Sequence, residues 1–527
     1  MRGLTVGTFH SVCLGQLAHK PVIGREQALD ILAHLLMEHE EKLSPAEALR
    51  LLSLYKSACR VRTEATAALP AWLPDAYAQR LELLGLRDLD DVLLDALDAP
   101  VHGKRMFRHL LVDEFQDINA AQHALVMHWA QESQSLFVIG DPDQAIYGFR
   151  GAKPDCFQAF LDAYPDARLI RLCRNYRSTP QIVQSALSVI RRNPGMEREL
   201  APCAASGADV RLWEAPDGFS EAVWIAKEIA RMAGGVDMLD AQNAKVESSV
   251  SRSFSDMAVL YRTRRQLEQV EMALNHDSIP CVICGRDAFL GSKVIQGMLG
   301  FFASLLDPAD GVSLCAALDG LWRVPPALCQ RATVALLPGA DAERLAAELA
   351  DFPLLSPWVE AVRQLAHPAR KTPPRKQLEA LARLCSLDTP DVTKLLNIAV
   401  FHEDMAGLLT ALRTGEEADI RRASGSAYAS GAVRLMTLHG AKGLEFPVVF
   451  LAGVNAGTLP MEHAHSASDV EEERRLFYVG ITRAREELIL SCGGAPSAFL
   501  AELPPTLCHG SIRPRNRVPK VEQLRLF

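Results

Sequence analysis

Two adjacent carboxylates close an apolar run in the first third of the chain. Residues 110–117 have the sequence Leu-Leu-Val-Asp-Glu-Phe-Gln-Asp, so Asp113 and Glu114 come directly after the apolar residues. If this run is a β-strand, its end presents the two groups that nucleotide hydrolysis needs, because one carboxylate holds Mg²⁺ and the next orients the attacking water. A solvated turn or a helix cap also places acidic residues after a strand, so this segment alone leaves both interpretations open.

Two aromatic side chains spaced by a glycine follow in residues 138–152, Val-Ile-Gly-Asp-Pro-Asp-Gln-Ala-Ile-Tyr-Gly-Phe-Arg-Gly-Ala. Tyr147 and Phe149 flank the glycine, and Arg150 comes next. Bases of any sequence stack on exposed rings, and arginine pairs with phosphate, so the pattern favours binding of a single-stranded nucleic acid. The alternative is a buried aromatic turn with no ligand.

These segments need a scaffold that brings strand ends together. Short apolar runs at 109–112 and 136–139 each end in acidic residues and are separated by a helical stretch, which predicts parallel strands. Further strands are expected at 169–172, 210–213, 257–261, 433–438, 448–451 and 488–491, with a charged helix at 471–484. Leu and Ala at three- and four-residue spacing predict helices over 26–97 and 286–430.

The bulk composition narrows the class of protein. A chain of 527 residues with 49% hydrophobic and 23% charged residues is globular and several domains long. The net charge of −8 excludes a uniformly basic coat for DNA, but it allows a basic groove. The sequence contains no apolar run of membrane-spanning length and no signal-peptide pattern, so we expect a cytoplasmic protein with no membrane partner. Cys281 and Cys284 lie in an apolar run that predicts a strand rather than a zinc site.

The ordered set of segments resembles the motifs of UvrD/Rep-type superfamily 1 DNA helicases. Residues 110–117 and 138–152 are similar to helicase motifs II and III. The other matching segments follow in family order along nearly the whole chain: Gly7-Thr-Phe-His-Ser11, Arg174-Asn-Tyr-Arg-Ser-Thr-Pro180, Tyr261-Arg-Thr263, residues 433–446 (Val-Arg-Leu-Met-Thr-Leu-His-Gly-Ala-Lys-Gly-Leu-Glu-Phe) and residues 471–484 (Glu-Glu-Glu-Arg-Arg-Leu-Phe-Tyr-Val-Gly-Ile-Thr-Arg-Ala).

The resemblance implies an α/β fold with two RecA-like motor domains of the P-loop NTPase type, each with parallel strands and a helical insertion. We expect the first motor domain, which the resemblance leaves incomplete, at 1–12 and 104–166, with its insertion at 13–103. The second is expected at 167–285 and 431–494, with a helical regulatory insertion at 286–430, and a flexible tail at 495–527.

The resemblance also implies a role for individual residues in an ATP- and Mg²⁺-dependent motor that acts on single-stranded DNA and partial duplexes. Asp113 would serve Mg²⁺, Glu114 would be the catalytic carboxylate and Gln144 would sense the terminal phosphate. Arg177 and Arg483 would neutralise charge on the transferred phosphoryl group, although Arg483 could instead form a surface ion pair with glutamates of its own helix. Tyr176 would stack on adenine and Glu445 would accept from ligand hydroxyls. The DNA path would be lined by Thr8, Phe9, His10, Tyr147, Phe149, Arg150, Thr437 and His439.

One departure from the family pattern concerns the phosphate-binding loop, G-x-x-x-x-G-K-[ST], which the family carries before the Thr-Phe-His motif. The string does not occur in this sequence. A truncated chain, half of a split protein, and a variant that binds DNA without hydrolysing ATP are the three explanations. We expect truncation, because the other residues of the ATP side keep the family's types.

The sequence leaves two functional hypotheses open and suggests one protein partner. The main hypothesis is an ATP-dependent 3′-to-5′ DNA helicase in repair, replication restart or recombination, and the alternative is a non-hydrolysing DNA-binding or recruitment protein. A helicase–nuclease is disfavoured because no second acidic cluster with a Gln-x-x-x-Tyr pattern follows residues 471–484. Gln523, Leu524, Leu526 and Phe527 resemble the bacterial sliding-clamp-binding motif, so the clamp is a candidate partner. A tail folded onto its own domain is the alternative.

Overall fold

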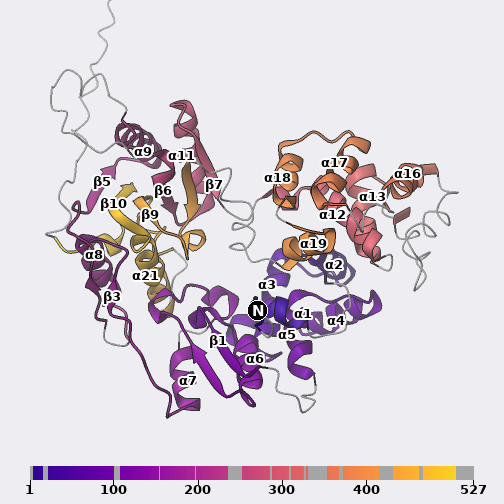
Figure 1. Cartoon of the computed structure of the whole chain (residues 1–527), viewed down its shortest axis with the longest axis horizontal. Coiled ribbons are helices and arrows are strands. Elements are labelled where there is room, and N and C mark those ends of the chain that lie inside the picture. The colour runs from indigo at the N-terminus through magenta and orange to yellow at the C-terminus, as the bar shows by residue number, and fades with distance from the viewer. Residues whose placement is uncertain are drawn as a thin grey trace, which may run out of the picture. The chain divides into compact units, whose positions relative to one another are not determined.

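The computed structural model of the chain describes residues 4–15, 22–99, 107–152, 155–195, 198–234, 252–284, 288–307, 310–325, 328–329, 353–366, 372–400, 402–414, 431–461 and 467–505. The chain forms two compact units (Figure 1). Unit 1 comprises residues 1–140, 149–153 and 286–426, and unit 2 comprises residues 141–148, 154–285 and 427–527. Each unit is therefore built from segments that are distant in the sequence.

Unit 2 contains a parallel six-stranded sheet in the order β5-β10-β9-β6-β8-β7. Its central strand β6 is buried at every position, which fits the continuous apolar sequence Met-Ala-Val-Leu-Tyr. The strands are β5 (Arg211–Ala215), β6 (Met257–Tyr261), β7 (Cys281–Cys284), β8 (Val433–Thr437), β9 (Phe446–Leu451) and β10 (Ala484–Gly493). A separate pair joins β3 (Arg174–Asn175) to β4 (Ala201–Pro202).

Helices cover both faces of this sheet, because successive strand residues contribute to two different cores. One core contains Ala258 and Leu260 with residues of α8 and α21, and the other contains Met257 and Val259 with residues of α9 and α11. The helices of unit 2 are α7 (Cys156–Ala163), α8 (Pro180–Ile190), α9 (Gly218–Met232), α11 (Arg264–His276) and α21 (Ala467–Ile481), with single turns η3 (Pro142–Gln144), η5 (Phe254–Asp256), η9 (His439–Ala441) and η10 (Ala498–Glu502).

Unit 1 contains a parallel pair of strands, β1 (His109–Val112) and β2 (Ser135–Val138), joined through helix α6 (Ala120–Ala130). Helix α6 packs with α1 (Phe9–Leu14) and α5 (Leu89–Asp98) around Cys13, Leu93 and Trp129. Turn η2 (Phe115–Asp117) follows β1, and turn η4 (Gly148–Arg150) enters unit 1 at Phe149. The sequence-predicted strand–helix–strand arrangement of this region is confirmed.

The rest of unit 1 is helical. One core joins α2 (Arg25–Glu38), α3 (Pro45–Ser57) and α4 (Leu73–Leu83), with turn η1 (Glu64–Thr66) beside them. A second core is formed by the described part of residues 286–426. Its elements are η6 (Ala288–Gly291), α12 (Lys293–Leu306), α13 (Gly311–Trp322), η7 (Pro353–Leu355), α16 (Ser356–Leu365), α17 (Pro374–Leu384), α18 (Pro390–Ala399) and α19 (Met405–Thr414).

Two sequence predictions of secondary structure are corrected. Residues 169–172 form no strand, and Leu169, Ile170 and Leu172 are exposed. A strand needs a neighbour for its backbone groups, and pairing in this region begins only at β3. The helix expected at 471–484 ends at Ile481, so Arg483 lies in a turn and Ala484 begins β10.

The α/β class with parallel strands, predicted from the sequence, is confirmed. Cys281 and Cys284 lie in strand β7, as expected. Across the part of the chain that the structure describes, no cluster of three or more His, Cys, Asp or Glu side chains could hold a metal ion. None of the described helices combines the length and the apolar sequence needed to cross a membrane.

Candidate functional site

The candidate catalytic carboxylates lie at the carboxyl end of β1. Asp113 and Glu114 are both exposed, and Glu114 adopts a left-handed backbone conformation with φ of 50° and ψ of 42°. The Glu114 amide donates to Asp113 Oδ1 at 2.9 Å, and the Gln116 side chain donates to Glu114 Oε2. Left-handed residues concentrate in turns and functional loops, and this one directs two adjacent carboxylates to solvent.

Gln144 lies in the polar segment that the sequence assigns to phosphate sensing. Its side-chain amide donates to Asp141 Oδ2 at 2.8 Å, and its backbone carbonyl accepts from Lys442 Nζ at 2.6 Å. Burial raises the pKa of Asp141, and the hydrogen bond from Gln144 partly opposes that rise. Lys442 also lies 5.2 Å from the centre of the Tyr147 ring. The segment is therefore tied to residues 433–446 of the same unit.

Arg483 is almost fully buried, with 1% of its surface exposed. Its Nη2 atom donates to Gln144 Oε1 at 3.3 Å. Its other hydrogen bonds reach the carbonyls of Val479 at 3.0 Å and Leu444 at 3.1 Å, and Thr482 Oγ1 at 3.2 Å. The alternative of a surface ion pair within its own helix is wrong, because Arg483 is buried and lies beyond the end of α21.

Helix α21 holds residues 141–148 by contacts that the sequence analysis missed. Arg475 Nε donates to the carbonyl of Ala145 at 2.9 Å, and Glu472 Oε1 accepts from the Gly148 amide at 3.0 Å. Burial raises the pKa of Glu472, which the Gly148 hydrogen bond partly offsets. The charged sequence 471–475 was noted only as a helical pattern, and its spacing could not indicate which residues face this segment.

Residues 141–148 are also held by Arg198, which the sequence analysis did not identify. Arg198 forms two hydrogen bonds with Asp143, through Nε at 2.7 Å and Nη2 at 2.8 Å. Paired contacts of this kind fix both position and orientation. Residues 141–148 are thus held at Asp143, Gln144, Ala145 and Gly148 by groups of unit 2.

Arg177 and Glu445, which the resemblance places on the nucleotide side, contact each other. Arg177 Nε donates to Glu445 Oε2 at 2.6 Å, and Arg485 Nη1 lies 3.6 Å from Glu445 Oε1. These side chains are roughly 40–50% exposed, so the pair contributes little to stability. Tyr176 is 72% exposed beside them, which leaves its ring accessible to a planar ligand.

The residues expected to contact DNA at the start of the chain lie on α1. Thr8 caps this helix by accepting from the Ser11 amide at 3.3 Å. The Phe9 ring stacks on Trp129 with centroids 6.0 Å apart, so it belongs partly to the core. The His10 ring hydrogen-bonds to the backbone of Leu89, and burial lowers its pKa while the Asp88 charge partly raises it.

Of the two aromatic rings in residues 138–152, that of Tyr147 is packed and that of Phe149 is exposed. Tyr147 is half-buried against the core of unit 2, and its ring lies 6.3 Å from that of His439. Phe149 is 49% exposed, and the Arg150 guanidinium lies 5.5 Å from its ring centre. The interpretation as a buried turn therefore fits Tyr147 better than Phe149.

Thr437 and His439 lie at the carboxyl end of β8, at the start of η9. Thr437 Oγ1 accepts from the Gly440 amide at 3.2 Å, which closes the turn after the strand. Both side chains are half-buried. The structure thus brings His439 and Tyr147 together, while Thr437 holds the local turn.

The donor set at Asp113 fits a magnesium site of the kind in which phosphates and waters supply most ligands. Mg²⁺ is usually bound by one or two carboxylates together with substrate phosphates. Asp113 and Glu114 are exposed carboxylates at a strand end. A phosphate-dependent site does not require the three-residue cluster that is lacking from the described residues.

Comparison with known proteins gives matches along most of the chain. The family model of the UvrD/REP helicase N-terminal domain matches residues 25–165, and that of the UvrD-like helicase C-terminal domain matches residues 170–352 and 360–493. The ATP-dependent DNA helicase UvrD1 of Mycobacterium tuberculosis is 30% identical, covering 96% of this chain and 76% of that protein.

Two other relatives show similar coverage. The ATP-dependent DNA helicase PcrA of Bacillus subtilis is 28% identical, over 95% of this chain and 76% of that protein. DNA helicase II of Escherichia coli is 27% identical, over 95% of this chain and 77% of that protein.

Proposed function

Because the chain belongs to the UvrD-like family of DNA helicases, we propose that it is an ATP-driven motor that moves 3′ to 5′ along single-stranded DNA and opens partial duplexes. Its family relatives are named as ATP-dependent DNA helicases. The polarity and the action on duplexes are part of the proposal.

The observation that carries the proposal is the contact between Gln144 and Arg483. A buried guanidinium donates to a side-chain amide at 3.3 Å, although a neutral amide is a weaker acceptor than an anion. A terminal phosphate would be a stronger acceptor for the same N–H group. We infer that the terminal phosphate of a bound nucleotide replaces the Gln144 side chain as the hydrogen-bond acceptor of Arg483. Nucleotide binding would then change the contacts of both residues.

The other residues of the nucleotide side then have separate roles. Asp113 would hold Mg²⁺, and Glu114 would orient the attacking water. Arg177 would leave Glu445 for the phosphate, which would let Glu445 accept from the ligand hydroxyls, and Tyr176 would stack on the base. An arginine directed at a transferred phosphoryl group contributes on the order of 10³–10⁵ in rate. When bound with the nucleotide, Mg²⁺ would supply charge neutralisation.

On the DNA side, the exposed Phe149 would stack on bases and Arg150 would contact phosphate. Thr8, Phe9 and His10 of unit 1 and Tyr147, Thr437 and His439 of unit 2 complete the proposed DNA-contacting set. Phe9 and Tyr147 are packed on one side, so each would present only an edge or one face.

The proposal extends to a process and a partner. DNA repair, replication restart and recombination all require a motor on single-stranded DNA, and we propose that the protein acts in one of them. Gln523, Leu524, Leu526 and Phe527 lie outside the described residues. We propose them as a sliding-clamp-binding peptide. Binding of the clamp to a peptide ending in Phe527, but not to one with Leu526 and Phe527 changed to Ala, tests this.

The function is tested with partial duplexes that carry a 3′ or a 5′ single-stranded tail. Because the G-x-x-x-x-G-K-[ST] string does not occur in the 527 residues, we expect little ATP hydrolysis from these residues alone. We expect a version that carries this loop before the Thr-Phe-His motif to hydrolyse ATP faster with single-stranded DNA and to separate strands only from the 3′ tail. Arg483→Lys should abolish both activities, since a single ammonium cannot replace the forked donors. The matched control is Arg231→Lys, an exposed arginine of the same unit that pairs with Glu228.

The same assay distinguishes the second candidate, a protein that binds single-stranded DNA without hydrolysing ATP. Binding of DNA with no ATP hydrolysis would favour that candidate, which the absence of the G-x-x-x-x-G-K-[ST] string from the 527 residues also supports. Strand separation from the 5′ tail would contradict the proposed polarity. A chain that neither binds DNA nor hydrolyses ATP would contradict both candidates.

A further inference from the structure

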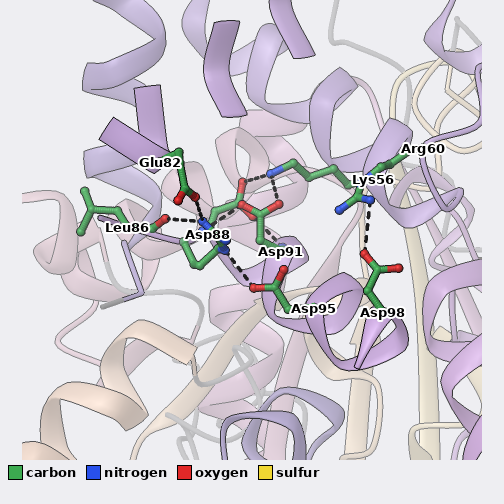
Figure 2. Close-up of polar contacts among 9 residues, drawn as sticks. Lys56, Arg60, Glu82, Leu86, Asp88, Asp91, Asp95 and Asp98 are labelled. Carbon is green, nitrogen blue, oxygen red and sulfur yellow. Dashed lines mark hydrogen bonds and ion pairs between the residues drawn. The ribbon is translucent and has the colours of Figure 1, made fainter. Parts of the chain in front are cut away.

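A buried lysine–aspartate cluster lies at the start of α5. Lys56 Nζ, on α3, is 2.6 Å from Asp88 Oδ2 and 2.7 Å from Asp91 Oδ1. Figure 2 shows the lysine amine between these two carboxylates. Only 6% of the Lys56 surface is exposed, and the amine lies 5.1 Å from the centre of the Tyr77 ring. The cluster therefore joins α3, α4 and α5.

Asp88 also caps the N-terminus of α5. Its Oδ1 atom accepts from the Asp91 amide at 2.9 Å, while Asp91 Oδ2 accepts from the Asp88 amide at 3.4 Å. Arg87, which precedes Asp88 in the chain, contacts Asp95 at 2.8 Å and Glu82 at 2.9 Å. The first turn of α5 is thus fixed by side chains on both sides.

This first turn is where α1 meets α5. The His10 ring hydrogen-bonds to the backbone of Leu89, the residue after Asp88, and Asp88 is the charge that acts on it. Further along the two helices, Cys13 of α1 packs in one core with Val92 and Leu93 of α5. The position of His10 is therefore set by the same turn that Lys56 holds.

The helix that carries Lys56 also supports the other candidate DNA segment of unit 1. Gly151 has φ of +86°, and a Cβ atom built on it would lie 2.8 Å from Ser57 Oγ, next to Lys56 in α3. Phe149 and Arg150 directly precede this glycine. The end of α3 thus lies beside the first turn of α5, to which the His10 ring is hydrogen-bonded, and also beside residues 149–151.

We propose that Lys56 and Asp88 are positioning residues for single-stranded DNA binding: they fix the first turn of α5 and, through it, the place and the charge of the His10 ring. The inference rests on the proposed function, in which His10 contacts DNA. Protonated His10 pairs with a phosphate, so DNA affinity rises as the pH falls through the pKa of His10.

The charges around His10 give the two residues effects of the same sign. Asp88 is the charged group that acts on His10, and Asp88 itself lies among Lys56 of α3, Tyr77 of α4 and Asp90 and Asp91 of α5. Removing the negative charge of Asp88 lowers the pKa of His10 further. Removing Lys56 leaves Asp88 buried without its cation, so Asp88 takes up a proton and the pKa of His10 falls as well. A residue that served only the fold would weaken DNA binding without shifting its pH dependence.

The test is a titration of a fluorescent oligothymidylate with the full chain between pH 5 and 8 at constant salt. For the wild type, we expect affinity to rise on acidification, and His10→Gln should remove most of this rise. Asp88→Asn, which keeps a capping side chain, should shift the profile to lower pH by roughly half a unit or more, and Lys56→Met should shift it in the same direction, because Asp88 then takes up a proton. Controls are Asp166→Asn and Lys376→Met, both exposed.

A separate variant covers the case in which Lys56→Met does not fold. In Lys56→Met/Asp88→Asn/Asp91→Asn the lysine and both of its carboxylate partners are neutral, so neither Asp88 nor Asp91 is left as a buried charge without its partner. Because Asp88 is the charge that acts on His10, this variant should shift the profile to lower pH. Profiles that coincide with that of the wild type, or a shift to higher pH in either Asp88→Asn or Lys56→Met, would overturn the inference. Loss of wild-type DNA binding would instead refute the proposed function.

Discussion

The Nη2 atom of Arg483 lies 3.3 Å from the Oε1 atom of Gln144, at a point where the arginine is 1% exposed. Gln144 comes from η3 and Arg483 from the turn between α21 and β10. The two are 339 residues apart in the chain. Arg475, Glu472 and Arg198 hold the residues around Gln144, so Arg483 contacts a segment that is fixed on both sides.

The first prediction concerns the energy of this contact. In a double-mutant cycle with Gln144→Ala and Arg483→Lys, we expect a coupling energy of about 0.5–1.5 kcal/mol, because the hydrogen bond is single and long. Hydrogen–deuterium exchange of peptides from α21 measures the local opening free energy in each variant. A cycle of Gln144→Ala with Arg231→Ala should be additive, since Arg231 pairs with Glu228 on its own helix. Equal coupling in both cycles would show that the contact has no energetic role.

The second prediction concerns catalysis. In a version that carries the G-x-x-x-x-G-K-[ST] loop, Glu114→Gln should lower DNA-stimulated ATP hydrolysis by about 10²–10⁴-fold, since a positioned carboxylate contributes this much to proton transfer. Stability should change little, because Glu114 is exposed and Gln can keep the hydrogen bond from Gln116. The steady-state hydrolysis rate is compared with that of Glu132→Gln, an exposed glutamate of the same unit. A rate within about threefold of the wild type would remove Glu114 from this role.

The third prediction separates two phenylalanines by their burial. Phe149→Ala should weaken binding of single-stranded DNA by about 1–3 kcal/mol with little base preference, as expected for lost stacking. Its thermal stability should be close to that of the wild type, since the ring is 49% exposed. Phe9→Ala should instead lower stability, because it removes the stack on Trp129. Anisotropy and thermal melts distinguish these outcomes, and a Phe149→Ala chain that melts early but binds normally would assign Phe149 to the core.

The sequence predicts much of the sheet of unit 2, because its buried parallel strands are continuous apolar runs. Residues 257–261 were expected as a strand and form β6, which is buried at every position. Residues 433–438 and 448–451 likewise correspond to β8 and β9. The run 169–172 is also largely apolar, but no strand within the described part of the chain pairs with it. Local pattern therefore indicates strand formation only where the fold supplies a neighbour.

The sequence predicted which residues belong to the candidate site, but it did not predict which of them contact one another. Asp113, Gln144 and Arg483 were chosen because their segments follow a family order. Their hydrogen-bond partners could not be read from spacing, since Gln144 and Arg483 meet only through tertiary folding. The cluster around Lys56 was missed for a related reason. A lysine in an amphipathic helix is usually solvated, and nothing local indicates that Asp88 will lie over it.

Asp90, in the first turn of α5, provides the last prediction. Burial and the nearby Asp88 charge raise the pKa of Asp90 to about 7, from its ordinary value of 3.8. The folded chain therefore binds a proton that the unfolded chain releases. The stabilisation that this proton provides is complete below pH 3.8 and is lost as the pH rises to about 7.

Asp90→Asn should remove this pH dependence, because the amide stays neutral and can keep a hydrogen bond with Ser53. Relative to the wild type, the variant should gain about 1–3 kcal/mol in free energy of unfolding between pH 4 and pH 8, most of it before pH 7. Urea unfolding followed by circular dichroism at several pH values measures the gain. Asp75→Asn, an exposed aspartate on α4, is the matched control and should parallel the wild type. If the difference between Asp90→Asn and the wild type does not change with pH, Asp90 is ionised in the folded chain throughout this range.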